Sequence, residues 1–145
     1  MREKKRNVRT IIRSALVLVV VFTLMGCSTP STKLSDKFDE ETVKSEAMRS
    51  VEYFNDRDYA SIIEMGSEEL KASITEAQFA EQCDPYLDKD GAFKEITKTV
   101  VMGSEDKTTG ETYGGVVMIG SYENGKIQFT IGFDEEMKLV QFIIK

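Results

Sequence analysis

The first half of the globular part of the chain carries apolar residues at helical spacing. Between residues 36 and 55 they recur every three or four positions, which predicts an amphipathic helix. Pro85 is expected to kink or end a later helix, because proline removes a backbone hydrogen bond. The predicted helices are residues 36–55, residues 59–65, a turn that begins at Ser67, and a helix that begins at the capping box Thr75 to Gln78.

After Gly91 the apolar spacing changes to the two-residue period of strands. The predicted strands are residues 96–102, 113–122, 127–133 and 138–144. Asn124-Gly125 predicts a hairpin with a type I′ turn. Four glycines lie in or beside the strands and predict bulges and strong curvature: Gly114, Gly115, Gly120 and Gly132. Helices followed by strands predict an α+β domain over residues 36–145, with the N-terminal helices packed on a curved four-stranded antiparallel meander.

The first 25 residues have the pattern of an export signal. A basic stretch precedes an apolar run over residues 15–25, and this run is shorter than the about 20 residues that a transmembrane helix needs. Leu24-Met25-Gly26-Cys27 resembles the lipobox of bacterial lipoproteins. The resemblance implies cleavage before Cys27, and a diacylglycerol thioether with further acylation (palmitate) on that cysteine.

The expected organisation follows from that cleavage site. Residues 1–26 are a signal peptide, residues 27–35 are the lipidated cysteine and a flexible tether, and residues 36–145 form the domain. The protein is then held at the extracytoplasmic face of the cell membrane by its lipid. Anchoring by two or three acyl chains is stable, whereas one chain is marginal.

Charge and composition exclude several functions. Residues 1–26 carry six basic side chains and one acidic one, so they hold +5 of a net charge of −6, and the remaining residues hold −11. Such an acidic domain is not expected to bind nucleic acid, which requires basic patches. The chain contains no histidine, so serine–histidine catalysis and histidine-based zinc sites are excluded. Cys83, without a partner once Cys27 is lipidated, is expected to be a buried and inert thiol.

Two stretches resemble a bacterial domain family of unknown function. One is residues 53–59 (YFNDRDY), and the other is residues 91–96 (GAFKEI) with residues 122–126 (YENGK) and 129–131 (FTI). The family has a cystatin-like, nuclear-transport-factor-two-like cone fold, in which the sheet and the first helix enclose a pocket. The resemblance implies this fold over about residues 40–145 and supplies no catalytic residue.

The candidate pocket follows from that fold. Its apolar wall would contain Phe129, Ile131 and Phe133, with Val116, Met118, Phe142 and Ile144 beside them, unless these side chains simply fill the core. Its polar mouth would contain Tyr53, Tyr59, Tyr113 and Asp58. We predict no cofactor, no metal and no catalytic residue.

The leading hypothesis is a non-enzymatic module that binds a small apolar ligand or an envelope protein. One alternative is a small cone-fold enzyme that uses aspartate and tyrosine. The other is a structural module of an envelope assembly, such as a homodimer formed through the open sheet face.

Overall fold

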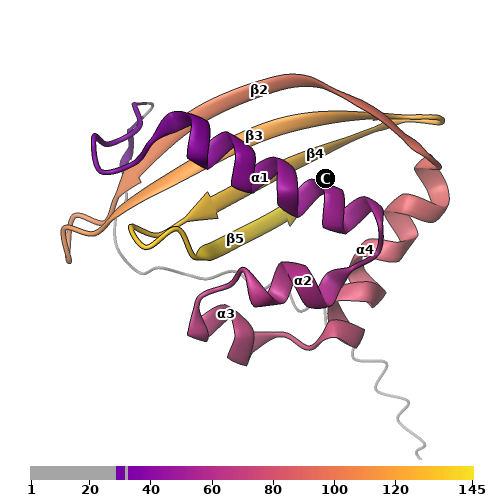
Figure 1. Ribbon diagram of the computed structural model, residues 1–145, viewed down its shortest axis with the longest axis horizontal. Helices are drawn as coiled ribbons and strands as arrows, with labels where there is room; N and C mark the ends of the chain where they lie inside the picture. The colour runs from indigo at the N-terminus through magenta and orange to yellow at the C-terminus, as the bar shows by residue number, and fades with distance from the viewer. Residues whose placement is uncertain (1–28, 32) are drawn as a thin grey trace, which may run out of the picture.

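The computed structural model describes residues 29–31 and 33–145 of the chain (Figure 1). The helices are α1 (Glu40–Asn55), α2 (Tyr59–Glu64), α3 (Glu68–Ser73) and α4 (Glu76–Asp90). The strands are β1 (Thr29–Ser31), β2 (Phe93–Glu105), β3 (Thr112–Tyr122), β4 (Lys126–Phe133) and β5 (Leu139–Ile144). The α+β prediction, with helices first and an antiparallel meander second, is confirmed. Among the described residues, no helix is both long enough and apolar enough to cross a membrane.

Side-chain caps set where the helices begin. The Asp39 carboxylate accepts the backbone N–H of Thr42, so α1 begins at residue 40, four residues after the predicted start. The predicted capping box of α4 is present, since Thr75 and Gln78 bond reciprocally. Pro85 was predicted to kink or end this helix, and it does not end it, because α4 continues to Asp90. Pro85 is exposed, so water can hydrate the carbonyl that the missing N–H leaves free.

All five strands pair antiparallel in the order β1-β2-β3-β4-β5. The predicted hairpin joins β3 and β4, but the predicted type I′ turn is wrong, since neither Asn124 nor Gly125 has a positive φ. The reason is a tertiary contact with α4. The backbone N–H of Asn124 donates to the carbonyl of Asp90 at the end of α4, and the Asp90 carboxylate lies against Gly125.

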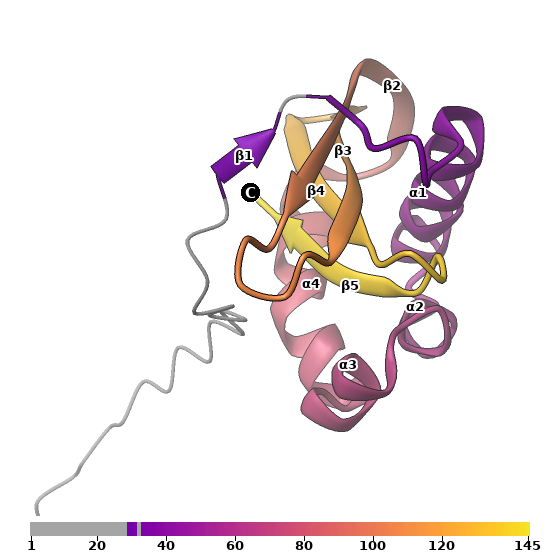
Figure 2. The same ribbon diagram turned by 90° about the vertical axis from the view of Figure 1, so that its left-hand side faces the viewer.

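The sheet is curved, and the four helices lie on its concave side (Figures 1 and 2). Register shifts fall between Phe93 and Glu95, between Ile96 and Lys98, and at Gly132. Of the four glycines expected to bend the sheet, Gly132 lies at one such shift, and Gly120 pairs with Ile96 at another. Gly114 serves another purpose, because a Cβ there would stand 2.9 Å from the Phe38 ring that packs over it.

The core lies between α1 and the concave face of the sheet. The inward residues of β4 are Ile127, Phe129, Ile131 and Phe133, as the alternation predicted. They meet the buried face of α1, made of Val43, Ala47, Val51 and Phe54. The rings of Phe54 and Phe129 form an edge-to-face pair with centroids 5.2 Å apart.

The segment that precedes α1 is attached to the sheet. β1 pairs with residues 103–105 of β2, inside the segment that the sequence predicts as a tether. The Lys33 backbone lies directly on Gly103, and Lys37 pairs with Glu135 at 2.6 Å. Cys27 and the lipobox lie outside the described residues.

Candidate functional site

The residues predicted to form a pocket lie in or against the core. Phe129, Ile131 and Phe133 are at most 1% exposed, and Tyr59 is 2% exposed. Tyr53 is partly buried and packs against the same cluster. None of the five lines either of the two surface hollows described below. Their common property is that they fill the space between the helices and the sheet.

The hydroxyls of Tyr59 and Tyr113, two tyrosines of the predicted mouth, are engaged in separate places. Tyr59 donates to the Asp84 carboxylate at 2.5 Å, where Arg57 also pairs with Asp84 at 2.7 Å and with Asp88 at 2.6 Å. Tyr113 donates to Glu111, at the other end of the sheet. Tyr59 and Tyr113 are therefore not brought to one cavity. Asp58, the predicted acid, caps α2 by accepting the N–H and hydroxyl of Ser61.

The Tyr59 cluster joins the α1–α2 turn to α4. Arg57 adopts a positive φ of 58°, and its side chain reaches Asp84 and Asp88 on α4. Burial, and then the neighbouring Asp84, raise the pKa of Tyr59 well above its ordinary value. The hydrogen bond from Tyr59, and after it the Arg57 guanidinium, lower the pKa of Asp84. At neutral pH the pair is therefore a phenol and a carboxylate.

Cys83 lies on the inner face of α4 and is 4% exposed. Burial, and then the neighbouring Asp84, raise the pKa of its thiol to about 12. The predicted burial of the thiol is confirmed, and its raised pKa is the opposite of the lowered pKa that a reactive cysteine needs.

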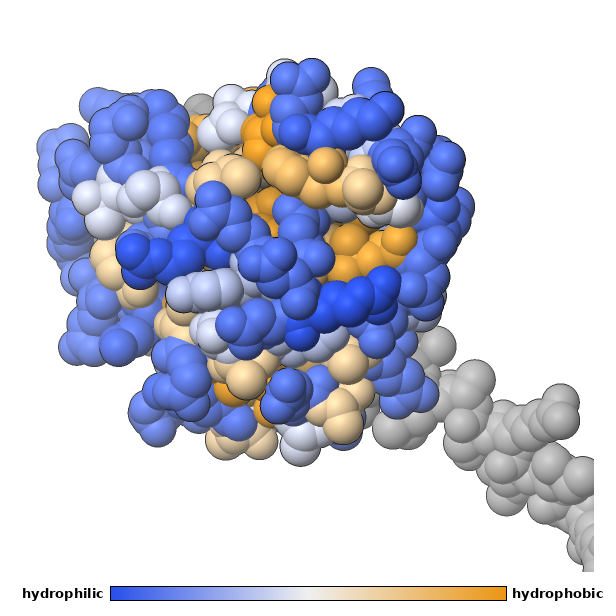
Figure 3. Space-filling model, turned by 45° about the vertical axis from the view of Figure 1, so that its right-hand side comes forward, coloured by the Kyte–Doolittle hydropathy of each residue, from blue (hydrophilic) through white to orange (hydrophobic). Residues whose placement is uncertain are grey.

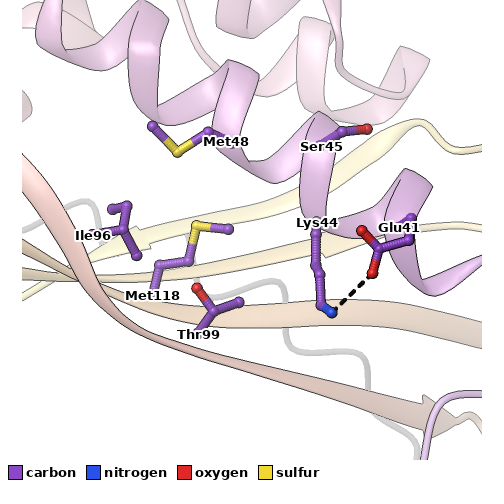
Figure 4. A pocket seen from close by; sticks show the side chains of 7 residues that line it. All are labelled: Glu41, Lys44, Ser45, Met48, Ile96, Thr99 and Met118. Atoms are coloured by element: carbon purple, nitrogen blue, oxygen red, sulfur yellow. Dashed lines mark hydrogen bonds and ion pairs between the residues drawn. The ribbon is translucent and has the colours of Figure 1, made fainter.

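A groove opens between α1 and the adjacent part of the sheet, with a volume of about 450 Å³. Its apolar lining comes from Met48 of α1, Ile96 of β2 and Met118 of β3, which lie between the helix and the strands (Figure 4). Its polar lining is Glu41, Lys44, Ser45 and Thr99. Lys44 pairs with Glu40 at 2.6 Å and with Glu41 at 3.1 Å, and the hydrogen bond with Glu40, followed by that with Glu41, raises the pKa of Lys44.

The groove runs along an edge strand. Among the described residues, only β1 pairs with the outer edge of β2, and it covers only residues 103–105. Residues 94–102 carry exposed or half-exposed side chains, and no strand among residues 29–31 and 33–145 pairs with their outward backbone groups. In the space-filling view, small areas of hydrophobic surface are surrounded by hydrophilic residues (Figure 3). The groove therefore combines an apolar floor with a free row of backbone donors and acceptors.

A second hollow of about 290 Å³ lies where the chain enters the domain. It is lined by Lys33, Leu34, Ser35, Asp36, Ser104, Glu105 and Thr112. Among residues 29–31 and 33–145, no three acidic or cysteine side chains are grouped so that they could hold a metal ion.

Sequence reasoning missed most of the groove. Of its seven lining residues, only Met118 is among those that the sequence places on the concave face. Met48 and Ile96 have the spacing of ordinary core residues, and the sequence holds no signal that the core stops short of the β2 edge.

Comparison with known proteins gives a family but no activity. Residues 47–142 match the family described as "Protein of unknown function (DUF3887)". A protein from Ruminococcus gnavus ATCC 29149, with a structure solved by NMR, is 32% identical to this chain. That similarity covers 79% of this chain and 98% of the other, with a TM-score of 0.69. No curated protein matches the sequence.

Proposed function

The chain belongs to the DUF3887 family of proteins of unknown function, and we propose that it is a lipid-anchored extracytoplasmic lipoprotein whose domain binds an extended peptide segment. The observation that carries the binding proposal is the groove beside the free edge of β2. The lipobox at Cys27 carries the anchoring proposal.

An extended peptide fits this site for a geometric reason. A strand added to residues 96–102 of β2 would hydrogen-bond to the unpaired backbone edge, as β1 does at residues 103–105. Every second side chain of that strand would point towards Met48 and Met118, and the others towards solvent. The backbone bonds would supply affinity, and the apolar floor would select apolar side chains at alternate positions.

The polar side chains of the domain favour binding over catalysis. Tyr59, Asp84 and Asp58 are engaged in a helix junction and a helix cap. The buried hydroxyl of Ser50 donates to the carbonyl of Ala47 within α1. Lys44 in the groove is paired with two carboxylates, and its raised pKa keeps it protonated and therefore a poor nucleophile.

The anchor is tested by metabolic labelling of the full chain with radioactive palmitate. We expect Cys27→Ala to abolish labelling and to shift the protein out of the membrane fraction. Cys83→Ala is the matched control and should keep both properties, since Cys83 is buried in the domain. Continued labelling of Cys27→Ala, or native protein that keeps its first 26 residues in the cytosol, would contradict the assignment.

Peptide binding is tested by panning the immobilised full chain with a library of ten-residue peptides. Enriched sequences should alternate apolar and polar residues, and Met48→Glu should abolish their binding by placing a charge in the apolar floor. Ala77→Asp, an exposed substitution on α4 away from the groove, should leave binding unchanged. If the enriched peptides bind Met48→Glu as well as they bind the wild type, the groove is not their binding site. Turnover of a substrate that is lost in Tyr59→Phe or Asp84→Asn would instead favour the enzyme alternative.

A further inference from the structure

The convex face of the sheet carries a row of β-branched side chains, three of them aliphatic. Val100 of β2 lies opposite Val117 of β3, Val117 lies opposite Thr130 of β4, and Thr130 lies opposite Ile143 of β5. Their neighbours along each strand point to the concave side, as the burial of Val116 and Met118 shows. The four side chains therefore form one β-branched stripe across the sheet.

This row is open in the described part of the chain. Val100 and Ile143, the two ends of the row, are 41% and 38% exposed, and they are the large hydrophobic residues that the described structure leaves most exposed. The helices pack against the other face of the sheet (Figure 2). Clustered apolar side chains on a sheet face without a covering layer mark an interaction surface.

Charge distinguishes the two sides of the row. On β4, Lys126 lies four residues before Thr130, and Asp134 lies four residues after it, directly beyond the strand end. Lys98 and Lys145 lie on the same side of the row as Lys126, and Glu95 is the acidic side chain beside them. On the opposite side, Tyr113 donates a hydrogen bond to Glu111, and burial, followed by Glu111, Asp106 and Asp134, raises the pKa of Tyr113 to about 12. One side of the row therefore carries more basic than acidic side chains, and the other side carries Asp134 and Glu111.

We propose that a second copy of this chain packs on the convex face, with a two-fold axis that runs along the row from Val100 to Ile143. This axis reverses the strand direction of the second copy. Lys126 of one copy then meets Asp134 of the other. A two-fold axis along the strands would instead place the basic ends together, so charge selects the first arrangement.

The arrangement predicts which residues meet. With the axis along the row, Val100 lies opposite Val100 of the second copy, and Ile143 lies opposite Ile143. Sheets that pack face to face are about 10 Å apart, within reach of a short bis-maleimide between introduced cysteines. With the axis along the strands, Val100 would lie opposite Ile143.

The test uses the full chain in isolated membranes. Val100→Cys and Ile143→Cys, each alone, should give a covalent dimer with the bis-maleimide. Ala77→Cys on α4 and the unsubstituted protein should not, since Cys83 is buried and the thiol of Cys27 is blocked by the proposed lipid. Failure of both row variants overturns the proposal. If a covalent dimer forms only when Val100→Cys and Ile143→Cys are produced together, the proposed direction of the axis is wrong.

A second measurement uses association in detergent. Ile143→Asp places a charge at a position that is already exposed in the single chain, so folding should be kept and is checked by circular dichroism. Sedimentation equilibrium should show that the association constant falls about tenfold or more. A tenfold fall corresponds to a loss of about 1.4 kcal/mol in the free energy of association. Ala77→Asp should leave it unchanged. A strictly monomeric native protein, or equal association of both variants, overturns the proposal.

Discussion

Tyr59→Phe tests how the helices are held together. The change removes only the hydroxyl that bonds Asp84 at 2.5 Å and keeps the ring, which stacks on Phe79 with centroids 5.4 Å apart. A hydrogen bond to a charged group is worth about 1.5–3 kcal/mol. The Asp84 side chain is 38% exposed and keeps its bond to Arg57, so water replaces part of the loss. We therefore expect the free energy of unfolding to fall by about 1 kcal/mol at pH 7, or about 4 °C in Tm.

The pH dependence of this difference is the sharper measurement. The pKa of Tyr59 is raised by burial in the folded state, whereas an unfolded tyrosine has a pKa of about 10. The protonated phenol therefore stabilises the fold fully below pH 10, and this stability is lost as the pH rises above 10 towards the folded-state pKa. At pH 11 the ionisation of Tyr59 in the unfolded chain has lowered the free energy of unfolding of the wild type by about 1.4 kcal/mol. Tyr59→Phe has no such loss.

Urea unfolding followed by circular dichroism between pH 8 and pH 11 measures both proteins. The advantage of the wild type should be constant up to pH 9 and should vanish by pH 11. The other titrating groups are common to the two proteins and cancel in the comparison. Stability curves that stay parallel up to pH 11 would refute the reasoning, because they would show that the Tyr59 hydroxyl ionises equally in the folded and unfolded chains.

Three further outcomes are expected. Phe129→Ala should lower the free energy of unfolding by about 3–5 kcal/mol in urea unfolding, because Phe129 is fully buried against Phe54 and leaves a cavity. Gly125→Ala should cost about 1–3 kcal/mol in the same assay, since its Cβ would stand 2.5 Å from an oxygen of the buried Asp90. Cys83 should not react with a maleimide at pH 7 until denaturant is added, because the thiol is buried and its pKa is about 12; rapid labelling of the native protein would contradict its placement.

Local patterns predicted the elements and the direction in which their side chains point. The alternation in residues 127–133 gave the buried face of β4, and the Thr75 capping box gave the start of α4. Both features depend on residues within one turn or one strand. The type I′ turn failed because Asn124 bonds to the end of α4, a contact between elements that no local pattern encodes.

The candidate site was harder to predict for the same reason. The pattern shows that Phe129 and Ile131 point inward, but whether inward residues line a cavity or fill it depends on how closely α1 approaches the sheet. In the fold, the ring of Phe54 occupies that space. The opening appears instead near the β2 edge, where no element in the described part of the chain covers Met48 and Ile96.

The two proposed surfaces and the anchor constrain one another. Thr29 begins β1 two residues after Cys27, and two extended residues span at most about 7 Å, so a lipid on Cys27 would hold the β1–β2 edge close to the membrane. A two-fold axis along the Val100–Ile143 row places the β2 edges of both copies at the same end of the axis, where two anchors can enter one membrane. The groove lies along that same edge of β2, next to residues 103–105, with which β1 pairs. A peptide bound there would therefore belong to a partner at the membrane surface, and the convex faces would be buried between the two copies without covering either groove.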